Sequence, residues 1–150
     1  MQITFKRKPV PIPADYRPLY KITLILLILE KNSRGKKASL MKLHLFSWAL
    51  KSNFSRERLI DALKTNDLPD LWSFEPSLNR ALIFAEAEKL CEVVNKTNYK
   101  ITTKGKEFLG KVLGDDQVFK DEKEFLNKVG LKVGETLIQN TIKKWNKYHA

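Results

Sequence analysis

The sequence predicts a mainly α-helical fold with one small β-hairpin, an extended N-terminal arm and extra C-terminal helices. Three observations lead to this fold class. Apolar residues recur at helical spacing over most of the chain after residue 15. Two short segments, 91–94 and 99–102, are β-branched or alternating and lie close enough to pair as a hairpin. A chain of 150 residues with 43% hydrophobic and 30% charged residues is typical of one globular domain with a sizeable core.

The first 15 residues are expected to form an extended arm. Pro9, Pro11 and Pro13 alternate there. Each proline lacks a backbone donor and disfavours helix in the residue before it. We expect this arm to lie on a partner or on its own domain.

A helix is expected over Tyr16–Lys31. Its apolar residues cover nearly every face, so it must lie at the centre of the domain or meet another chain. The side chains expected to contact a partner are Tyr16, Arg17, Leu19, Tyr20, Leu24 and Leu27.

Two more helices are expected before residue 70. A turn at Ser33–Lys37 precedes a helix over Ala38–Lys51. The next helix has Ser55 as its expected N-cap and ends near Asn66, and Phe54 is expected to pack on Leu59.

The helix before the hairpin is expected to run from Pro76 to about Leu90, because proline suits the first turn of a helix. Its expected apolar stripe consists of Leu78, Ala81, Leu82 and Ala85, widened by Ile83 and Phe84. After the hairpin, Thr103 is expected to cap a helix that stops at Gly114. Two further helices are expected over Asp116–Val129 and Val133–Tyr148.

This order of helices, hairpin and helix is that of a winged helix-turn-helix domain. The stretch SLNRALIFAEAEKLCEVVNKTNYKITTKGKEFL, residues 77–109, resembles the recognition helix, wing and following helix of MarR-like and PadR-like regulators. The predicted organisation is an arm over 1–15, a winged-helix domain over 16–114 and a helical extension over 115–150.

The net charge of +11 suggests a nucleic-acid partner, but the charge is unevenly placed. Residues 1–67 hold 14 Lys and Arg against 5 Asp and Glu. The expected recognition helix offers Asn79, Arg80 and Lys89, whereas Glu75, Glu86 and Glu88 would repel phosphate. Any DNA contact is therefore expected to be mainly non-specific. The side chains expected to contact nucleic acid or an acidic partner are Arg34, Lys36, Lys37, Lys96, Lys100 and Lys104.

A second resemblance covers RPLYKITLILLILEKNSRGKKASLMKLHLFSWALKS, residues 17–52. An Arg-Pro-Leu-Tyr entry, a Ser-Arg-Gly-Lys turn and a Leu-His-Leu-x-x-Trp-Ala-Leu helix resemble the middle component of bacterial ABC-three-component, Lamassu-like defence systems. The resemblance implies a non-catalytic subunit that links a large SMC/ABC-type ATPase to an effector, such as a nuclease, in defence against phage or plasmid DNA.

Catalytic, metal and cofactor sites are not expected. Ser39 and Lys42 form an S-x-x-K pair, but the other elements of penicillin-interacting enzymes are missing. Cys91 is the lone cysteine, and His44 and His149 have no partner at ligand spacing. For His44, a structural role in a helix is favoured over a functional one.

A cytoplasmic location is expected, because no secretory signal is recognised and the apolar run LILLIL is too short to span a membrane. The alternative function is a homodimeric winged-helix transcriptional regulator that pairs through residues 133–148. The sequence leaves open the identity of the partner and the oligomeric state.

Overall fold

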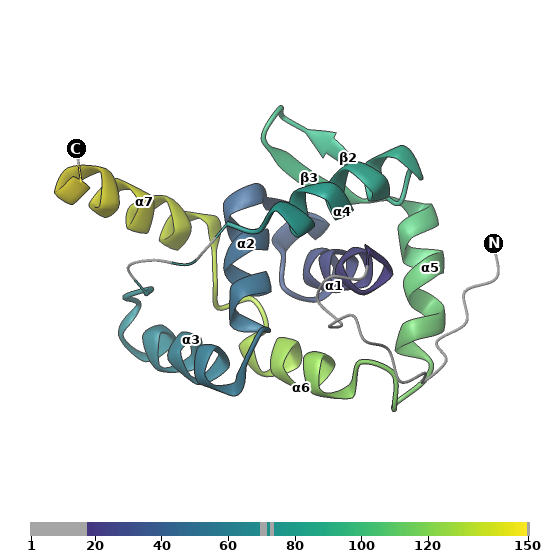
Figure 1. Ribbon diagram of the computed structural model, residues 1–150, viewed down its shortest axis with the longest axis horizontal. Coiled ribbons are helices and arrows are strands. Elements are labelled where there is room, and N and C mark those ends of the chain that lie inside the picture. The colour runs from purple at the N-terminus through teal and green to yellow at the C-terminus, as the bar shows by residue number, and fades with distance from the viewer. Residues whose placement is uncertain (1–17, 70–71, 73, 150) are drawn as a thin grey trace.

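The computed structural model describes residues 18–69, 72 and 74–149. This part of the chain is mainly helical, with seven α-helices and a small three-stranded antiparallel sheet (Figure 1). The helices are α1 Pro18–Lys31, α2 Leu40–Ala49, α3 Asn53–Thr65, α4 Pro76–Ala87, α5 Thr103–Leu113, α6 Lys120–Val129 and α7 Glu135–His149. The strands are β1 Lys37–Ser39, β2 Cys91–Val94 and β3 Asn98–Ile101, and a short 3-10 helix, η2, covers Arg34–Lys36. The predicted hairpin is confirmed, while the predicted arm over residues 1–15 lies outside the described residues.

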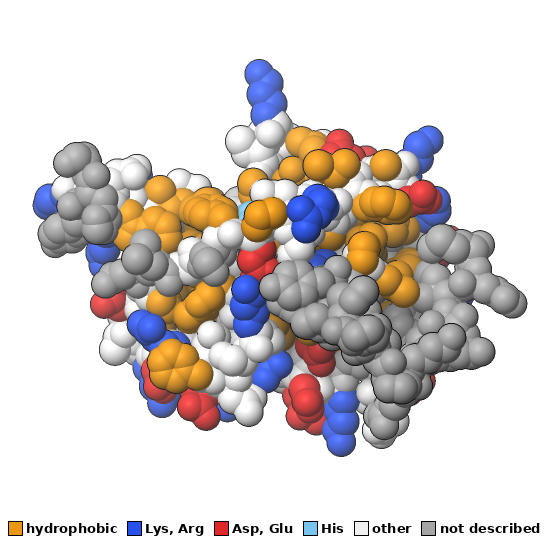
Figure 2. Space-filling model, in the orientation of Figure 1, with side chains coloured by type: hydrophobic (Ala, Val, Ile, Leu, Met, Phe, Trp, Pro, Cys, Tyr) orange, Lys and Arg blue, Asp and Glu red, His pale blue; other side chains and the backbone are white. Residues whose placement is uncertain are grey.

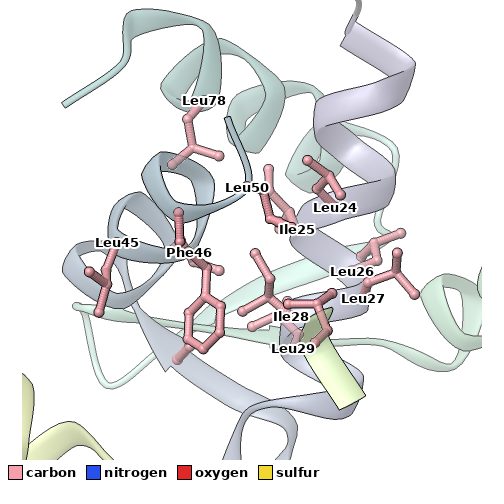
Figure 3. Packing of buried hydrophobic residues seen from close by; sticks show 14 of the residues in the cluster. Leu24, Ile25, Leu26, Leu27, Ile28, Leu29, Leu45, Phe46, Leu50 and Leu78 are labelled. Atoms are coloured by element: carbon pink, nitrogen blue, oxygen red, sulfur yellow. The ribbon is translucent and has the colours of Figure 1, made fainter. Parts of the chain in front are cut away.

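Helix α1 lies at the centre of the domain and is enclosed by the chain itself. All nine residues from Lys21 to Leu29 are buried, and α1 contacts α4, α5 and α6. Figure 3 shows the side chains of Leu24–Leu29 packed together with Leu45, Phe46, Leu50 and Leu78. Burial of each such side chain stabilises the fold by about 1.5–3 kcal/mol. Of the two settings that the sequence allows for this helix, the central one is confirmed.

Strand β1 differs from the sequence prediction, which places Ala38 and Ser39 in a helix. It pairs antiparallel with β3, and the strand order is β1-β3-β2. Ser39 ends the strand and caps α2, because its side chain accepts a hydrogen bond from the Lys42 backbone N–H. A strand of three residues that pairs with a distant segment has no local periodicity of its own, so sequence pattern could not reveal it.

Several helix ends lie a few residues from their predicted positions. The N-cap of α3 is Ser52, whose side chain accepts from Ser55 N, and the N-cap of α5 is Thr102, so the predictions of Ser55 and Thr103 are wrong. Both actual caps have extended backbone angles, which an N-cap requires. Helix α6 begins at Lys120, later than expected.

Phe54 does not pack on Leu59 as predicted. Its side chain is 69% exposed, and the guanidinium carbon of Arg58 lies 5.8 Å from the ring centroid. Leu59 is fully buried by other residues. The aromatic ring therefore lies on the surface of α3, where it contacts a cation from its own helix.

Helices α6 and α7 pack on the same core as the rest of the domain. The buried apolar cluster includes Phe125, Leu126, Val129 and Ile138. Asn32, which follows α1, is fully buried, and its Nδ2 donates to the carbonyls of Leu126 and Gly130, each at 2.8 Å. In Figure 1 the far end of α7 projects from the body of the domain. Within the described residues, no helix has both the length and the apolar character needed to cross a membrane.

Candidate functional site

The N-terminal end of α4 is fixed to the core by a buried ion pair. Glu75, the N-cap residue of α4, is 6% exposed, and its Oε2 accepts from Lys21 Nζ at 2.9 Å. Lys21 also donates to Ser47 Oγ at 2.9 Å, and Lys51 Nζ lies 3.0 Å from Glu75 Oε1. Burial acts to raise the pKa of Glu75, but the attraction of Lys21 and Lys51 outweighs it and holds the pKa below its ordinary value.

This arrangement corrects the expectation that Glu75 would repel phosphate. Its charge is balanced inside the domain by two lysines. Lys21, which is followed by the apolar run Leu24–Leu29, was the signal for such a pair, because lysine is almost never fully buried without a partner.

His44 fixes the segment that leads into α4. The side chain is fully buried, and its Nδ1 accepts a hydrogen bond from the Glu75 backbone N–H at 3.3 Å. The proton therefore sits on Nε2, which donates to Asn79 Oδ1 at 3.2 Å. Burial lowers the pKa of His44 below its ordinary value. These contacts support the structural role that the sequence favours for this histidine.

The outer face of α4 carries two large exposed apolar side chains. Leu78, Ala81, Leu82 and Ala85 are buried as predicted, but Ile83 and Phe84 are 68% and 58% exposed. The prediction that these two side chains widen the buried stripe is wrong, because the four buried residues already form the side of α4 that packs on the core. Figure 2 shows hydrophobic side chains gathered over the region of α4. We refer to Arg80, Ile83, Phe84 and Ala87 as the α4 surface.

The partner-contact residues expected on the first helix are mostly unavailable. Leu24 and Leu27 are 2% and 0% exposed, so their assignment to a partner surface is wrong. Leu19 and Tyr20 are half-buried, and the Tyr20 hydroxyl donates to Glu122 Oε2 at 2.9 Å while its ring stacks on Phe119. Tyr16 and Arg17 lie outside the described residues.

The expected basic residues fall into two groups. Lys37 and Lys100 are exposed and directly opposite each other across β1 and β3, and Arg34 and Lys96 are exposed nearby in sequence. The other two make contacts within the chain: Lys36 pairs with Glu30 at 3.4 Å, and Lys104 Nζ donates to the Glu88 carbonyl at 2.8 Å. The structure therefore brings Lys37 and Lys100 together, which the sequence could not show because β1 was not recognised.

A pocket of about 410 Å³ is lined in part by Ser39 and Asn98, which pair two positions along the strands from Lys37 and Lys100. It is formed by the start of α2, the end of the β2–β3 turn and the first two turns of α7, with Met41, Asn98, Glu135 and Gln139 among its lining residues. Glu135 Oε1 accepts from the Ser39 backbone N–H at 3.0 Å. Sequence reasoning missed this pocket, because its walls come from three segments that are distant in the chain.

The S-x-x-K pair is not arranged for nucleophilic catalysis. The Ser39 hydroxyl oxygen accepts from the Lys42 backbone, while Lys42 Nζ donates to the Asn32 carbonyl. Burial raises the pKa of the Cys91 thiol to about 12, so this side chain stays protonated at neutral pH. In residues 18–69, 72 and 74–149, no group of three or more His, Cys, Asp and Glu side chains is placed to hold a metal ion.

In comparisons with known proteins, no family model, curated protein or solved structure matches this chain.

Proposed function

We propose that this chain is a non-catalytic interaction subunit on a winged-helix frame, which links an SMC/ABC-type ATPase to an effector in defence against phage or plasmid DNA. The winged-helix assignment is supported by the order α2, α3, α4, β2, β3, and by β1 pairing with β3 as a third strand. The defence role is supported by the resemblance of residues 17–52 to the middle component of ABC-three-component systems.

The single observation that carries the interaction role is the α4 surface. A recognition helix that reads DNA should present basic side chains and side-chain amides to the groove. On α4, Ile83 and Phe84 are 68% and 58% exposed, Asn79 is engaged by His44, and Arg80 is the lone basic residue. Exposed aromatic and aliphatic side chains on a firmly anchored helix suit the centre of a protein interface.

The non-catalytic part of the proposal rests on the local geometry of the reactive residues. The Lys21 amine, which lies 2.9 Å from Ser47 Oγ, is held by the carboxylate of Glu75 and is not free to act as a base. Ser47 and Lys21 are 2% and 1% exposed, so a substrate would not reach them. Both residues support the fold of α4 against α1 and α2.

The test is co-expression with the SMC/ABC-type ATPases of the source genome, followed by size-exclusion chromatography with light scattering. We expect one complex for the native chain, loss of the complex for the double variant Ile83→Ser and Phe84→Ser, and retention for Phe54→Ser. Phe54 is a matched control because it is 69% exposed on α3. A native chain that stays separate from the ATPase would overturn the proposal.

A second candidate function, a homodimeric transcriptional regulator, is favoured by α7. Leu137, Ile142 and Trp145 on this helix are only partly buried, and its far end projects from the domain (Figure 1). A second copy could cover that stripe across a two-fold axis. Concentration-dependent dimerisation together with sequence-specific gel shifts that survive moderate salt would favour this candidate over the first.

A further inference from the structure

A lysine pair shares one face of the sheet with two residues of the pocket. In the β1–β3 register, Lys37 is opposite Lys100, and Ser39 is opposite Asn98. Residues two apart in a strand point to the same face, so both pairs share one face of the sheet. Ser39 and Asn98 also line the pocket of about 410 Å³. Lys37 and Lys100 therefore lie two positions along their strands from the pocket wall, and the Lys37 side chain leans toward Gly35, with its Cε 3.8 Å from the position a Gly35 Cβ would take.

One carboxylate offsets only part of the charge of this basic region. Arg34, Lys37, Lys96 and Lys100 are exposed and take part in none of the ion pairs within the described residues. The opposite charge nearest in register is Glu92, which faces Lys100 from β2. Like charges directly opposite each other destabilise a sheet and opposite charges stabilise it, so the Glu92 register accounts for Lys100, whereas fold stability does not explain Lys37.

The pocket offers groups that match a nucleobase. The side-chain amides of Asn98 and Gln139 hydrogen-bond to nothing in the described part of the chain, and such amides pair with base edges. The Glu135 carboxylate uses one oxygen for Ser39 N and can accept a base N–H, such as N3–H of thymine, with the other. Met41 supplies a polarizable thioether that packs against ring faces, and the volume lies within the range of ligand pockets.

We propose that this face binds a single strand of nucleic acid, with phosphates on Lys37 and Lys100 and one base in the pocket. A base inside a duplex is stacked and paired, whereas a base of a single strand is free to enter a pocket. An acidic protein segment is the competing occupant, and competition by polyglutamate distinguishes it from a nucleic-acid strand. The site uses none of the residues of the α4 surface, so this inference goes beyond the proposed function and does not depend on it.

The experiment measures fluorescence anisotropy with labelled oligothymidylate about 15 nucleotides long, the same backbone without bases, and a matched duplex. Titrations at about 50 mM and about 200 mM salt give the salt slope. We expect the native chain to bind the strand with bases about fivefold more tightly than the abasic strand, which corresponds to one additional hydrogen-bonded contact. The duplex should bind no more tightly than the abasic strand.

Two double variants separate the backbone contacts from the base contacts. Lys37→Ala with Lys100→Ala should weaken binding to both strands and lower the salt slope by about 1.4, because each single-strand phosphate contact contributes about 0.7. Asn98→Ala with Gln139→Ala should remove the preference for the strand with bases and leave the abasic affinity unchanged. The matched control is Lys106→Ala with Lys111→Ala, two exposed lysines on α5, which should change neither quantity.

Circular dichroism first confirms that each variant is folded. Removal of the like-charged Lys37–Lys100 pair should not unfold the sheet, so loss of binding in a folded variant supports the site. Equal affinity for the abasic strand, or tighter binding of the duplex, would overturn the base pocket. Equal effects of the α5 control variant, or equal competition by polyglutamate, would show general attraction for polyanions and overturn the site.

Discussion

Replacing Lys21 by methionine tests whether the buried ion pair holds α4 on the core. The change removes two hydrogen bonds of 2.9 Å, to Glu75 Oε2 and Ser47 Oγ, and leaves a carboxylate that is 6% exposed. Removing one partner of a buried pair costs about 3–5 kcal/mol. Because Lys51 still faces the other carboxylate oxygen at 3.0 Å, we expect the lower end, about 3 kcal/mol.

The assay is urea denaturation followed by circular dichroism, supported by thermal melts. In a domain of this size, about 3 kcal/mol corresponds to a fall in Tm of about 6–12 °C. Lys31→Met is the matched control on the same helix, because the Lys31 contact with Asn127 is exposed, and it should cost less than about 1 kcal/mol. Adding Glu75→Gln to Lys21→Met should restore part of the lost stability. A Lys21→Met variant within about 1 kcal/mol of the native chain would refute the reasoning.

Three other perturbations test separate features. Gly105→Ala should destabilise the fold by about 3 kcal/mol, because the new Cβ would lie 2.2 Å from the Leu90 carbonyl oxygen. Gly110→Ala is the control, because a Cβ there would meet nothing within 4 Å. In the same denaturation assay it should stabilise the fold by about 0.5–1 kcal/mol. The pKa of His44 in the folded chain should lie below 6.5 when measured by NMR. Because the folded pKa is lowered, the contribution of His44 to stability is present above pH 6.5 and is lost as the pH falls. A His44→Gln variant should lack this pH dependence. Burial lowers the pKa of Lys42 from 10.5 to about 8, so the free energy of unfolding should rise by about 1 kcal/mol between pH 8 and pH 9, and Lys42→Met should lack this rise. The range ends at pH 9 because burial raises the pKa of the Cys91 thiol from 9.0 to about 12, which lowers stability at higher pH. A flat profile in the native chain would contradict the burial of a titrating amine.

Local pattern was sufficient to predict most of the helices and the hairpin. The apolar residues of 16–31 predicted α1, the period of apolar residues predicted four buried positions of α4, and the pattern in 91–94 and 99–102 predicted the hairpin, whose second strand is Asn98–Ile101. Two caps were predicted wrongly, because the actual caps Ser52 and Thr102 are chemically similar to the predicted Ser55 and Thr103 and lie within one turn of them. The backbone angles that select between them depend on how the preceding segment arrives.

The candidate sites depended on contacts between distant segments. The sequence alone determined a first helix that is apolar on nearly every face, a basic N-terminal half, and the order of helices, β-hairpin and following helix, since these follow from residue type and spacing. Only the tertiary structure decided that α1 is enclosed by its own chain, that Ile83 and Phe84 face outward, and that Lys37 lies opposite Lys100 on a sheet face shared with two residues of a pocket. Periodicity identifies the faces of a helix or strand, but packing against the rest of the chain determines which of those faces stay in water.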